Sequence, residues 1–470
     1  MTDARVGRVA VRALVSPHPD ARVGRVAVRT LRRRDVTAVG RVSVRALIAP
    51  PAPPAADPDP RFWTHRLAAA LGLDPEGDQP IVELHTRAPG ATVWTHDTTM
   101  STALRGYTIN HGRRDARSRP DAATASLELV TAFMPGPLEL GTGVRVQLCE
   151  AVATELGLTG EDRIRFTGEV TDTATRHRQR VTAVVAAGRS GRLGRLGVDV
   201  TGWPAEPDTD RVERILDAVG LDTGAVGADG PTLAAPTQPA GARALLDTVA
   251  TSSGGVVLEQ PDGAVDYQGP EYRRGRTPAV TLDAGDVLSE VSWEQHVAAV
   301  VNDVTVTTAA GVLVRVTDPF SADPVTGYGP YPTAVSTELV SADLARELGT
   351  LLVGRYARPA WQLPALVATD RTVTTEQRAG LLRLRCGDRL ELTDLPAACP
   401  VPGVVIVEGW TETAAPRRWA LAVAVSDPVL SGVAVRWIDV PDTDAYQWQT
   451  VDPDLTWWDL TRVEDPGGLL

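Results

Sequence analysis

Two neighbouring stretches, RIRFTGEVTD (residues 163–172) and RVTAVVAAG (residues 180–188), decide the fold class of this 470-residue chain. In both, apolar and polar side chains alternate, which is the period of a half-buried β-strand. A polar turn separates them, so together they predict a hairpin. Similar alternating segments lie at 123–133 and 140–148, with Pro and Gly between them. The sequence therefore predicts a β-rich body with a barrel or sandwich architecture.

A second series of alternating segments lies in the C-terminal half of the chain. These segments cover residues 300–307, 312–317, 381–395, 404–410 and 417–427. Their order resembles that of residues 140–188, because a glycine (Gly141 or Gly387) precedes one strand and two further strands follow after loops. We interpret this order as two copies of one tube-like barrel. The alternative is that two unrelated stretches share a general pattern of short strands and turns.

The segments between these two series have helical patterns. Asp208 is expected to cap a helix that Gly220 closes, with Val212, Ile215, Leu216 and Val219 on its apolar face. A second helix is expected at 242–250, followed by a hairpin at 254–267 that turns at Asp262-Gly263. One more helix interrupts the second strand series. It begins after Ser341, has Leu344, Leu348, Leu351 and Leu352 on its apolar face, and stops before Pro359.

The predicted fold is mainly β with α+β insertions. It comprises two tube-like β-barrel domains, a small α+β domain and an extended N-terminal arm. The expected parts are a basic arm (1–49), a Pro-rich linker (50–60), the first barrel (61–202), the α+β domain (203–286), the second barrel with one helix (287–428) and a Trp-rich C-terminal tail (429–470).

The arm differs from the body in charge and is repetitive. Residues 1–50 hold eleven Arg and three Asp, a net charge of +8, so the remainder of this −12 chain carries −20. VGRV recurs at 6–9, 23–26 and 39–42, and apolar and Arg residues alternate within each repeat. Such strands are predicted to add to an exposed sheet edge, with a disordered arm as the alternative. The expected contact residues are Arg8, Val9, Val11, Arg12, Arg25, Val26, Val28, Arg29, Arg41, Val42, Val44 and Arg45.

The C-terminal tail is rich in Trp and Asp. Its tryptophans are Trp437, Trp448, Trp457 and Trp458. Exposed aromatic residues mark a contact surface. Packing of the tail back onto the body explains the same composition, and the sequence does not separate the two interpretations.

Signatures of catalysis, metal binding and membrane insertion are not found in the sequence. Three cysteines (Cys149, Cys386 and Cys399) and seven scattered histidines form no metal or nucleophile motif. The sequence has no P-loop, dinucleotide fingerprint, His-Glu-x-x-His or Gly-x-Ser-x-Gly motif. No apolar run approaches the roughly 18–20 residues of a membrane span, and no signal peptide is recognised. We expect no catalytic, cofactor-binding or metal-binding residues.

Several segments resemble those of a known family, in the same order along the chain. They are RIRFTGEVTD, RLGRLGVDVTGWPAEPDTDRVERILDAVGL (192–221), VVNDVTVTTAAG (300–311), CGDRLELTDLP (386–396), VEGWTETAAPRRWALAVAVSDP (407–428) and LTWWDL (455–460). They are similar to segments of the baseplate or tail-tip hub family of long-tailed phages, also described as tail-associated or minor tail proteins. The arm repeats resemble Arg/Val repeats near the N-termini of some actinophage tail proteins.

The resemblance implies a non-enzymatic virion protein at the tail tip, assembled in the host cytoplasm as a homotrimer. Two barrels in each of three subunits make six, which would match a three-fold hub to a six-fold tube. The implied partners are the distal tail ring protein, the tape measure protein and downstream tip or fibre proteins. DNA would pass through an acidic lumen without specific binding.

Three alternatives remain at this stage. The chain could be a distal tail ring protein, although a six-fold ring needs only one barrel per subunit. It could be the hub of a phage-derived contractile injection system. It could also be a carbohydrate-active enzyme, because an acidic chain offers many carboxylate pairs whose separation the sequence does not give.

Overall fold

The computed structural model describes residues 82–428 except 131–137, 177, 179, 228–229, 271, 274–276, 289–292, 360, 364, 397–398, 400, 402 and 416–417. All of these residues lie within the unit Asp57–Leu470. The contact residues predicted in the arm and the four tail tryptophans lie outside the described residues. In the described part of the chain, no helix is long and apolar enough to cross a membrane.

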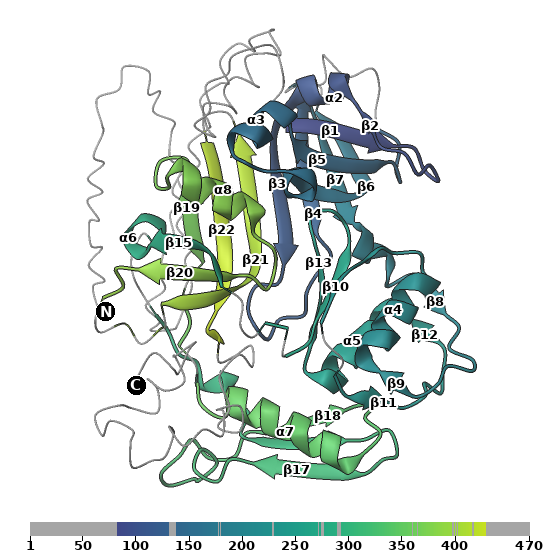
Figure 1. The fold of residues 1–470 in the computed structure, drawn as a ribbon, viewed down its shortest axis with the longest axis vertical. Coiled ribbons are helices and arrows are strands. Elements are labelled where there is room, and N and C mark those ends of the chain that lie inside the picture. The colour runs from purple at the N-terminus through teal and green to yellow at the C-terminus, as the bar shows by residue number, and fades with distance from the viewer. Residues whose placement is uncertain are drawn as a thin grey trace, which may run out of the picture. The chain divides into compact units, whose positions relative to one another are not determined.

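A twelve-stranded sheet combines strands from both halves of the chain (Figure 1). Its core path runs β15-β20-β21-β3-β4-β7-β6-β5-β1-β2, and β22 and β19 branch from β21. The strands are β1 (Val82–Arg87), β2 (Thr95–His96), β3 (Leu104–Gly112), β4 (Thr124–Val130), β5 (Gly143–Leu148), β6 (Ile164–Arg176), β7 (Val181–Gly188), β15 (Pro278–Asp283), β19 (Leu366–Thr369), β20 (Arg389–Thr393), β21 (Val404–Ala415) and β22 (Arg418–Ser426).

The two halves of this sheet repeat one strand order. In the first half, neighbouring strands run β4-β7-β6-β5-β1, and in the second they run β19-β22-β21-β20-β15. The three central strands of each set are antiparallel. Gly141 precedes β5 with φ +83°, and Gly387 precedes β20 with φ +94°. The similarity in strand order predicted from the sequence is therefore present. The predicted 163–188 hairpin is confirmed as the β6–β7 pair.

Strand β3 joins the two sets. Its one edge pairs with β4 and its other edge with the second part of β21, from Gly409 to Ala414. The β21–β22 register shifts between Val407 and Gly409, which is a β-bulge at Glu408. Because a bulge bends its strand, β21 can pair with β20 before Glu408 and with β3 after it. Figure 1 shows the purple and blue strands of the first half continuing into the yellow-green strands of the second.

The predicted closed barrels are not confirmed. Among the described strands the order is open at both ends, so no set closes on itself. A strand set closes into a barrel only when its first and last strands pair. The coarser prediction, mainly β with a few helices, is confirmed.

Four helices contribute residues to the hydrophobic core of the main sheet. They are α2 (Thr98–Ala103), α3 (Glu150–Glu155), α6 (Ala284–Val287) and α8 (Thr375–Arg383). The alternation at 381–395 predicted strand, and this prediction is wrong for residues 381–383. They form the end of α8, which begins with a reciprocal capping box between Thr374 and Gln377. Leu381 and Leu382 are buried in the main core on this helix.

A second core lies between two smaller groups of elements. The first group contains α4 (Asp208–Ala218), α5 (Ala242–Ser253), β10 (Thr223–Val226), β13 (Val256–Glu259) and β14 (Val265–Gln268), and the second contains β16 (Asp303–Thr307), β17 (Leu313–Thr317), β18 (Pro332–Ser336) and α7 (Ala342–Tyr356). The connections between these parts contain four short strands and three 3-10 turns. The strands are β8 (Gly197–Val198), β9 (Glu206–Pro207), β11 (Thr232–Leu233) and β12 (Ala240–Gly241), and the turns are η2 (Gly160–Arg163), η4 (Arg189–Arg192) and η5 (Val297–Ala299). Residues 304–357 thus share a core with the predicted α+β piece, whereas 366–425 share the core of the first strands. The exact domain boundaries stay a prediction.

One detail of the predicted helices needs correction. Asp208 is the first residue of α4, and Pro207 occupies the cap position. The Asp208 carboxylate instead accepts hydrogen bonds from Gly230 N and the Tyr267 hydroxyl.

In α7 the predicted Ser341 cap and apolar face are confirmed. Leu348 is buried in the second core, and Leu344, Leu351 and Leu352 are partly buried and pack against it.

Candidate functional site

Buried arginine–glutamate contacts lie where the two halves of the main sheet meet. Glu408 of β21 is fully buried, and its carboxylate lies 2.6 Å from Arg113 Nε and 3.2 Å from Arg273 Nη1. Ser426 Oγ donates to the same carboxylate at 2.6 Å. Burial alone would raise the pKa of Glu408, but Arg273 and Arg113 outweigh burial and lower the pKa to about 2. Glu408 is therefore an anion at neutral pH.

Glu412, four residues further along β21, forms the second contact set. Arg165 of β6 donates from Nε and Nη2 to one Glu412 oxygen, at 2.9 and 2.8 Å. The Tyr107 hydroxyl and Trp419 Nε1 donate to the other oxygen, at 2.9 and 3.2 Å. All four side chains are buried. These contacts satisfy a charge pair in the core and join β3, β6, β21 and β22.

His111 completes this buried centre. Its ring lies 5.0 Å from the Trp410 ring, and its Nε2–H donates to the Arg165 carbonyl at 2.9 Å. Burial lowers the pKa of His111 to about 4, so the ring is neutral at pH 7. Every group here is held by packing or by hydrogen bonds to protein. The contacts of Glu412 join strands of the two sets, and those of Glu408 bind two arginines, Arg113 and Arg273.

The cysteines have no features of a nucleophile. Burial raises the pKa of Cys386 far above its usual range, and it also raises the pKa of Cys149. A thiol is reactive when its pKa is lowered and its sulfur is accessible. Within the described ranges, no group of three His, Cys, Asp or Glu side chains is placed to hold a metal ion.

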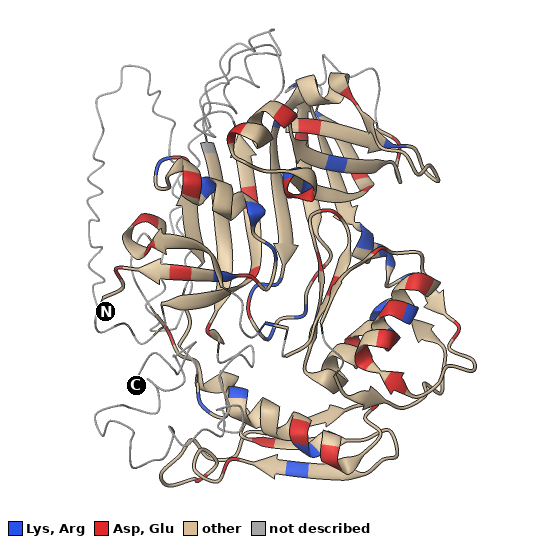
Figure 2. Ribbon diagram, in the orientation of Figure 1, with Lys and Arg blue, Asp and Glu red and all other residues tan. Residues whose placement is uncertain are grey.

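A cleft lined by arginines is an open site of the described structure. It has a volume of about 280 Å³ and lies between the loop after β3, helix α5, the β13–β14 hairpin and helix α7. Its described lining contains five arginines and one acidic residue, Asp247. We call this site the arginine cleft and define it by Arg113, Arg117, Arg119, Arg273 and Arg355. Figure 2 shows the basic residues along the loop below β3.

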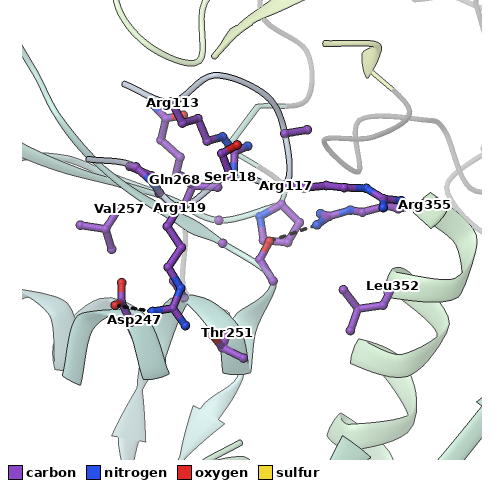
Figure 3. A pocket seen from close by; sticks show the side chains of 18 of the residues that line it. Arg113, Arg117, Ser118, Arg119, Asp247, Thr251, Val257, Gln268, Leu352 and Arg355 are labelled. Atoms are coloured by element: carbon purple, nitrogen blue, oxygen red, sulfur yellow. Dashed lines mark hydrogen bonds and ion pairs between the residues drawn. The ribbon is translucent and has the colours of Figure 1, made fainter. Parts of the chain in front are cut away.

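The contacts of these arginines are spread over the cleft wall. Arg119 Nη1 lies 3.4 Å from Asp247, which also accepts from Arg243 at 3.0 Å. Arg117 lies over the Tyr356 ring at 4.4 Å, and Arg355 Nη1 donates to the Gly254 carbonyl at 3.2 Å. Figure 3 shows Arg119 pointing to Asp247 on α5, with Leu352 on the opposite helix.

The electrostatic consequence is clearest at Arg355. Burial is the main cause that lowers the pKa of Arg355 to about 10; Arg273 and Arg113 act in the same direction, whereas Tyr356 and Glu408 act in the opposite one. A cation is thus held among other cations in a partly desolvated wall. An anionic group entering the cleft would reduce this repulsion.

Sequence reasoning did not find the arginine cleft. A signal was present, since residues 112–120 (GRRDARSRP) contain four arginines in a chain that is acidic outside its arm. The predicted interaction residues of the arm and the tail are not tested by the structure, because they lie outside the described residues.

Comparisons with known proteins give matches among solved structures alone. No family model matches the chain, and no curated protein matches its sequence. The fold is similar to that of two solved phage tail proteins. The 43 kDa tail protein of prophage MuSo2 from Shewanella oneidensis is 13% identical, with a TM-score of 0.51 over 74% of this chain and 99% of that one. A tail protein from Neisseria meningitidis MC58 is also 13% identical, with a TM-score of 0.52 over 75% and 98%. At this identity the similarity establishes a shared fold.

Proposed function

We propose that the chain is a structural virion protein, a homotrimeric hub at the distal tip of a phage tail, without enzymatic activity. The shared fold with two phage tail proteins supports a place in a tail. The order of segments in the sequence supports the tail-tip hub family, and the Arg/Val repeats of the arm support an actinobacteriophage origin. The hub would continue or close the tail tube and anchor tip proteins during DNA delivery.

The observation that carries this proposal is the repeated strand order. Within one chain, β4-β7-β6-β5-β1 and β19-β22-β21-β20-β15 have the same strand order. The first four strands of each set are antiparallel to their neighbours, and the sets differ in the fifth, since β1 is antiparallel to β5 and β15 is parallel to β20. Three such chains would present six similar strand sets, which is the number that a three-fold hub needs to meet a six-fold tube. A protein with one set per chain would need six copies for the same match.

The edges of the two sets support assembly between copies. Strand β6 of the first set corresponds to β21 of the second. The pairing of β6 with β5 ends at Glu169, and the register of β6 with β7 then shifts between Val170 and Asp172, as the register of β21 does at Glu408. In β21 the part beyond the bulge pairs with β3. Over residues 171–176 of β6, no described strand occupies the equivalent edge. Strand β19 pairs with β22 alone among the described strands. We infer that the β6 edge of one copy meets the β19 side of the next, which would close a tube from three chains.

The remaining partners follow from this position. The distal tail ring protein and the tape measure protein would contact one end of the hub, and tip or fibre proteins the other. The net charge of −20 outside the first 50 residues would help DNA pass through the lumen without binding, since DNA binding requires neutralisation of phosphates by cations.

Proline substitution on β6 tests the proposed edge. Successive N–H groups of a strand point to opposite sides, so one of Thr173→Pro and Ala174→Pro removes a donor from the outer edge alone. That variant is expected to keep the monomer fold by circular dichroism and to lose the trimer in light scattering. Thr173→Val, which keeps the donor, is the matched control and should form trimers. Trimers in both proline variants would contradict assembly through this edge.

A further inference from the structure

The arginine cleft has the charge, the lining and the position to bind an acidic, aromatic peptide. We propose that it binds the Trp- and Asp-rich part of the C-terminal tail of the same chain, residues 452–459 (DPDLTWWD). This assignment goes beyond the proposed hub function and does not depend on it.

The first argument is charge. Five arginines line the cleft together with Asp247, and Glu408 lies beneath two of them. Residues 429–470 contain eight acidic residues and two arginines, and three of the aspartates lie within 452–459. The planar guanidinium group forms paired hydrogen bonds with carboxylates. The tail therefore has the carboxylates that this cation-rich wall can bind.

The second argument is the shape and lining of the cleft. Its volume, about 280 Å³, is below the roughly 300–1,000 Å³ of pockets for drug-sized ligands. It is therefore suited to a few side chains of a peptide. Arg117 already lies over the Tyr356 ring at 4.4 Å, and Leu352 and Val257 add apolar surface. Arginine–aromatic stacking and apolar contact are the two interactions that Trp457 and Trp458 can offer.

The third argument is where the described chain ends. Strand β22 ends at Ser426, and the Ser426 hydroxyl donates to Glu408. The same carboxylate contacts Arg113 and Arg273 of the cleft. The described chain thus ends at Pro428, two residues after a side chain that shares the Glu408 carboxylate with the cleft arginines, and 23 residues lie between Pro428 and Asp452. Such a tether gives an effective concentration on the order of millimolar, so that even weak contacts are occupied.

Photo-crosslinking in the full chain tests this proposal. A benzophenone amino acid replaces Trp458, and the matched control carries it at Trp437, outside the Asp-rich part. The Trp458 probe is expected to crosslink within one chain to peptides that contain cleft residues, such as those of α7. The Trp437 probe is expected to give about tenfold less of these products, equivalent to 1.4 kcal/mol.

Charge reversal provides the second measurement. Arg117 and Arg119 have exposed side chains on a loop, so the double variant Arg117→Glu/Arg119→Glu is expected to fold and to lower the Trp458 crosslink about tenfold. Arg346→Glu is the control, because Arg346 lies on α7 with an exposed side chain and does not line the cleft. It should leave the crosslink yield unchanged.

Three results would overturn the proposal. The first is a Trp458 crosslink to residues outside the cleft, or no crosslink at all. The second is a yield that is the same in the double variant as in the native sequence. The third is a product with twice the mass of one chain, which would assign the tail to a neighbouring copy.

Discussion

Arg165 on β6 and Glu412 on β21 are separated by 247 residues, yet Arg165 Nη2 lies 2.8 Å from Glu412 Oε2 in the core. Both side chains are almost completely buried, and the carboxylate also accepts hydrogen bonds from Tyr107 and Trp419. Because each charge is buried against the other, removal of one leaves the other unpaired in a poorly solvated place. This pair holds the two strand sets together.

Glu412→Ala is therefore expected to destabilise the chain by about 3–5 kcal/mol, because it leaves the Arg165 guanidinium buried without its carboxylate. Urea unfolding measures this change. Glu128→Gln, an exposed position on β4, is the control and should change stability by less than about 0.5 kcal/mol. Equal effects of the two substitutions would show that the pair does not hold the sheet together.

Gly112 lies where the backbone of β3 comes close to the backbone of β21, and its replacement by Ala tests this contact. Its φ is +74°, and an added Cβ would lie 2.3 Å from the Glu408 carbonyl oxygen and 2.7 Å from Cys386 Sγ. Gly112→Ala is expected to cost about 2–5 kcal/mol, from the left-handed backbone and from the clash together. Gly90 has a similar φ of +78° with nothing within 4 Å, so Gly90→Ala should cost only about 1–2 kcal/mol. If thermal unfolding gives the same cost for both, the packing described at Gly112 is wrong.

His111 makes stability depend on pH. Its pKa falls from 6.5 to about 4 on folding, so the unfolded chain binds the proton more readily between these values. Stability is then lost as pH falls from 6.5 towards 4, by roughly 2–3 kcal/mol between pH 7 and 4.5. His111→Gln should remove this part of the dependence while it keeps a hydrogen-bond donor. Unfolding by urea at several pH values measures the difference, and parallel curves for the two proteins would contradict it.

The pH range for the His111 comparison ends at 4.5 because Glu408 also affects stability below that pH. Glu408 has a pKa of about 2 against an ordinary 4.5. Its contribution to stability is present above pH 4.5 and is lost as pH falls towards 2. A comparison of the two proteins above pH 4.5 therefore isolates His111.

Local patterns predicted much of the fold. The alternation at 163–188 predicted the β6–β7 hairpin, and the alternating segment 417–427 contains strand β22 (Arg418–Ser426). The Ser341 cap was also correct. In each case the signal lies within a few neighbouring residues. Helix α8 was missed although Thr374 and Gln377 form a capping box, because its short apolar run from 379 to 384 also suits a strand.

The buried centre and the cleft were not predictable in this way. Glu408 and Glu412 stand in a strand where acidic residues usually face solvent, and their partners Arg113, Arg165 and Arg273 lie elsewhere in the chain. The β21 bulge at Glu408 lies in the pairing with β22, and the strand beyond it pairs with β3; a pattern within β21 shows neither. Contacts between segments that are distant in the sequence therefore form the buried centre and the arginine cleft.

The measurement that tests the central claim most directly is the solution mass of the purified chain by light scattering, over a range of concentrations. The chain mass is 49.9 kDa, so a trimer has a mass of about 150 kDa. The hub proposal predicts a species of that mass. A hexamer of about 300 kDa, or a monomer at every concentration, would contradict it.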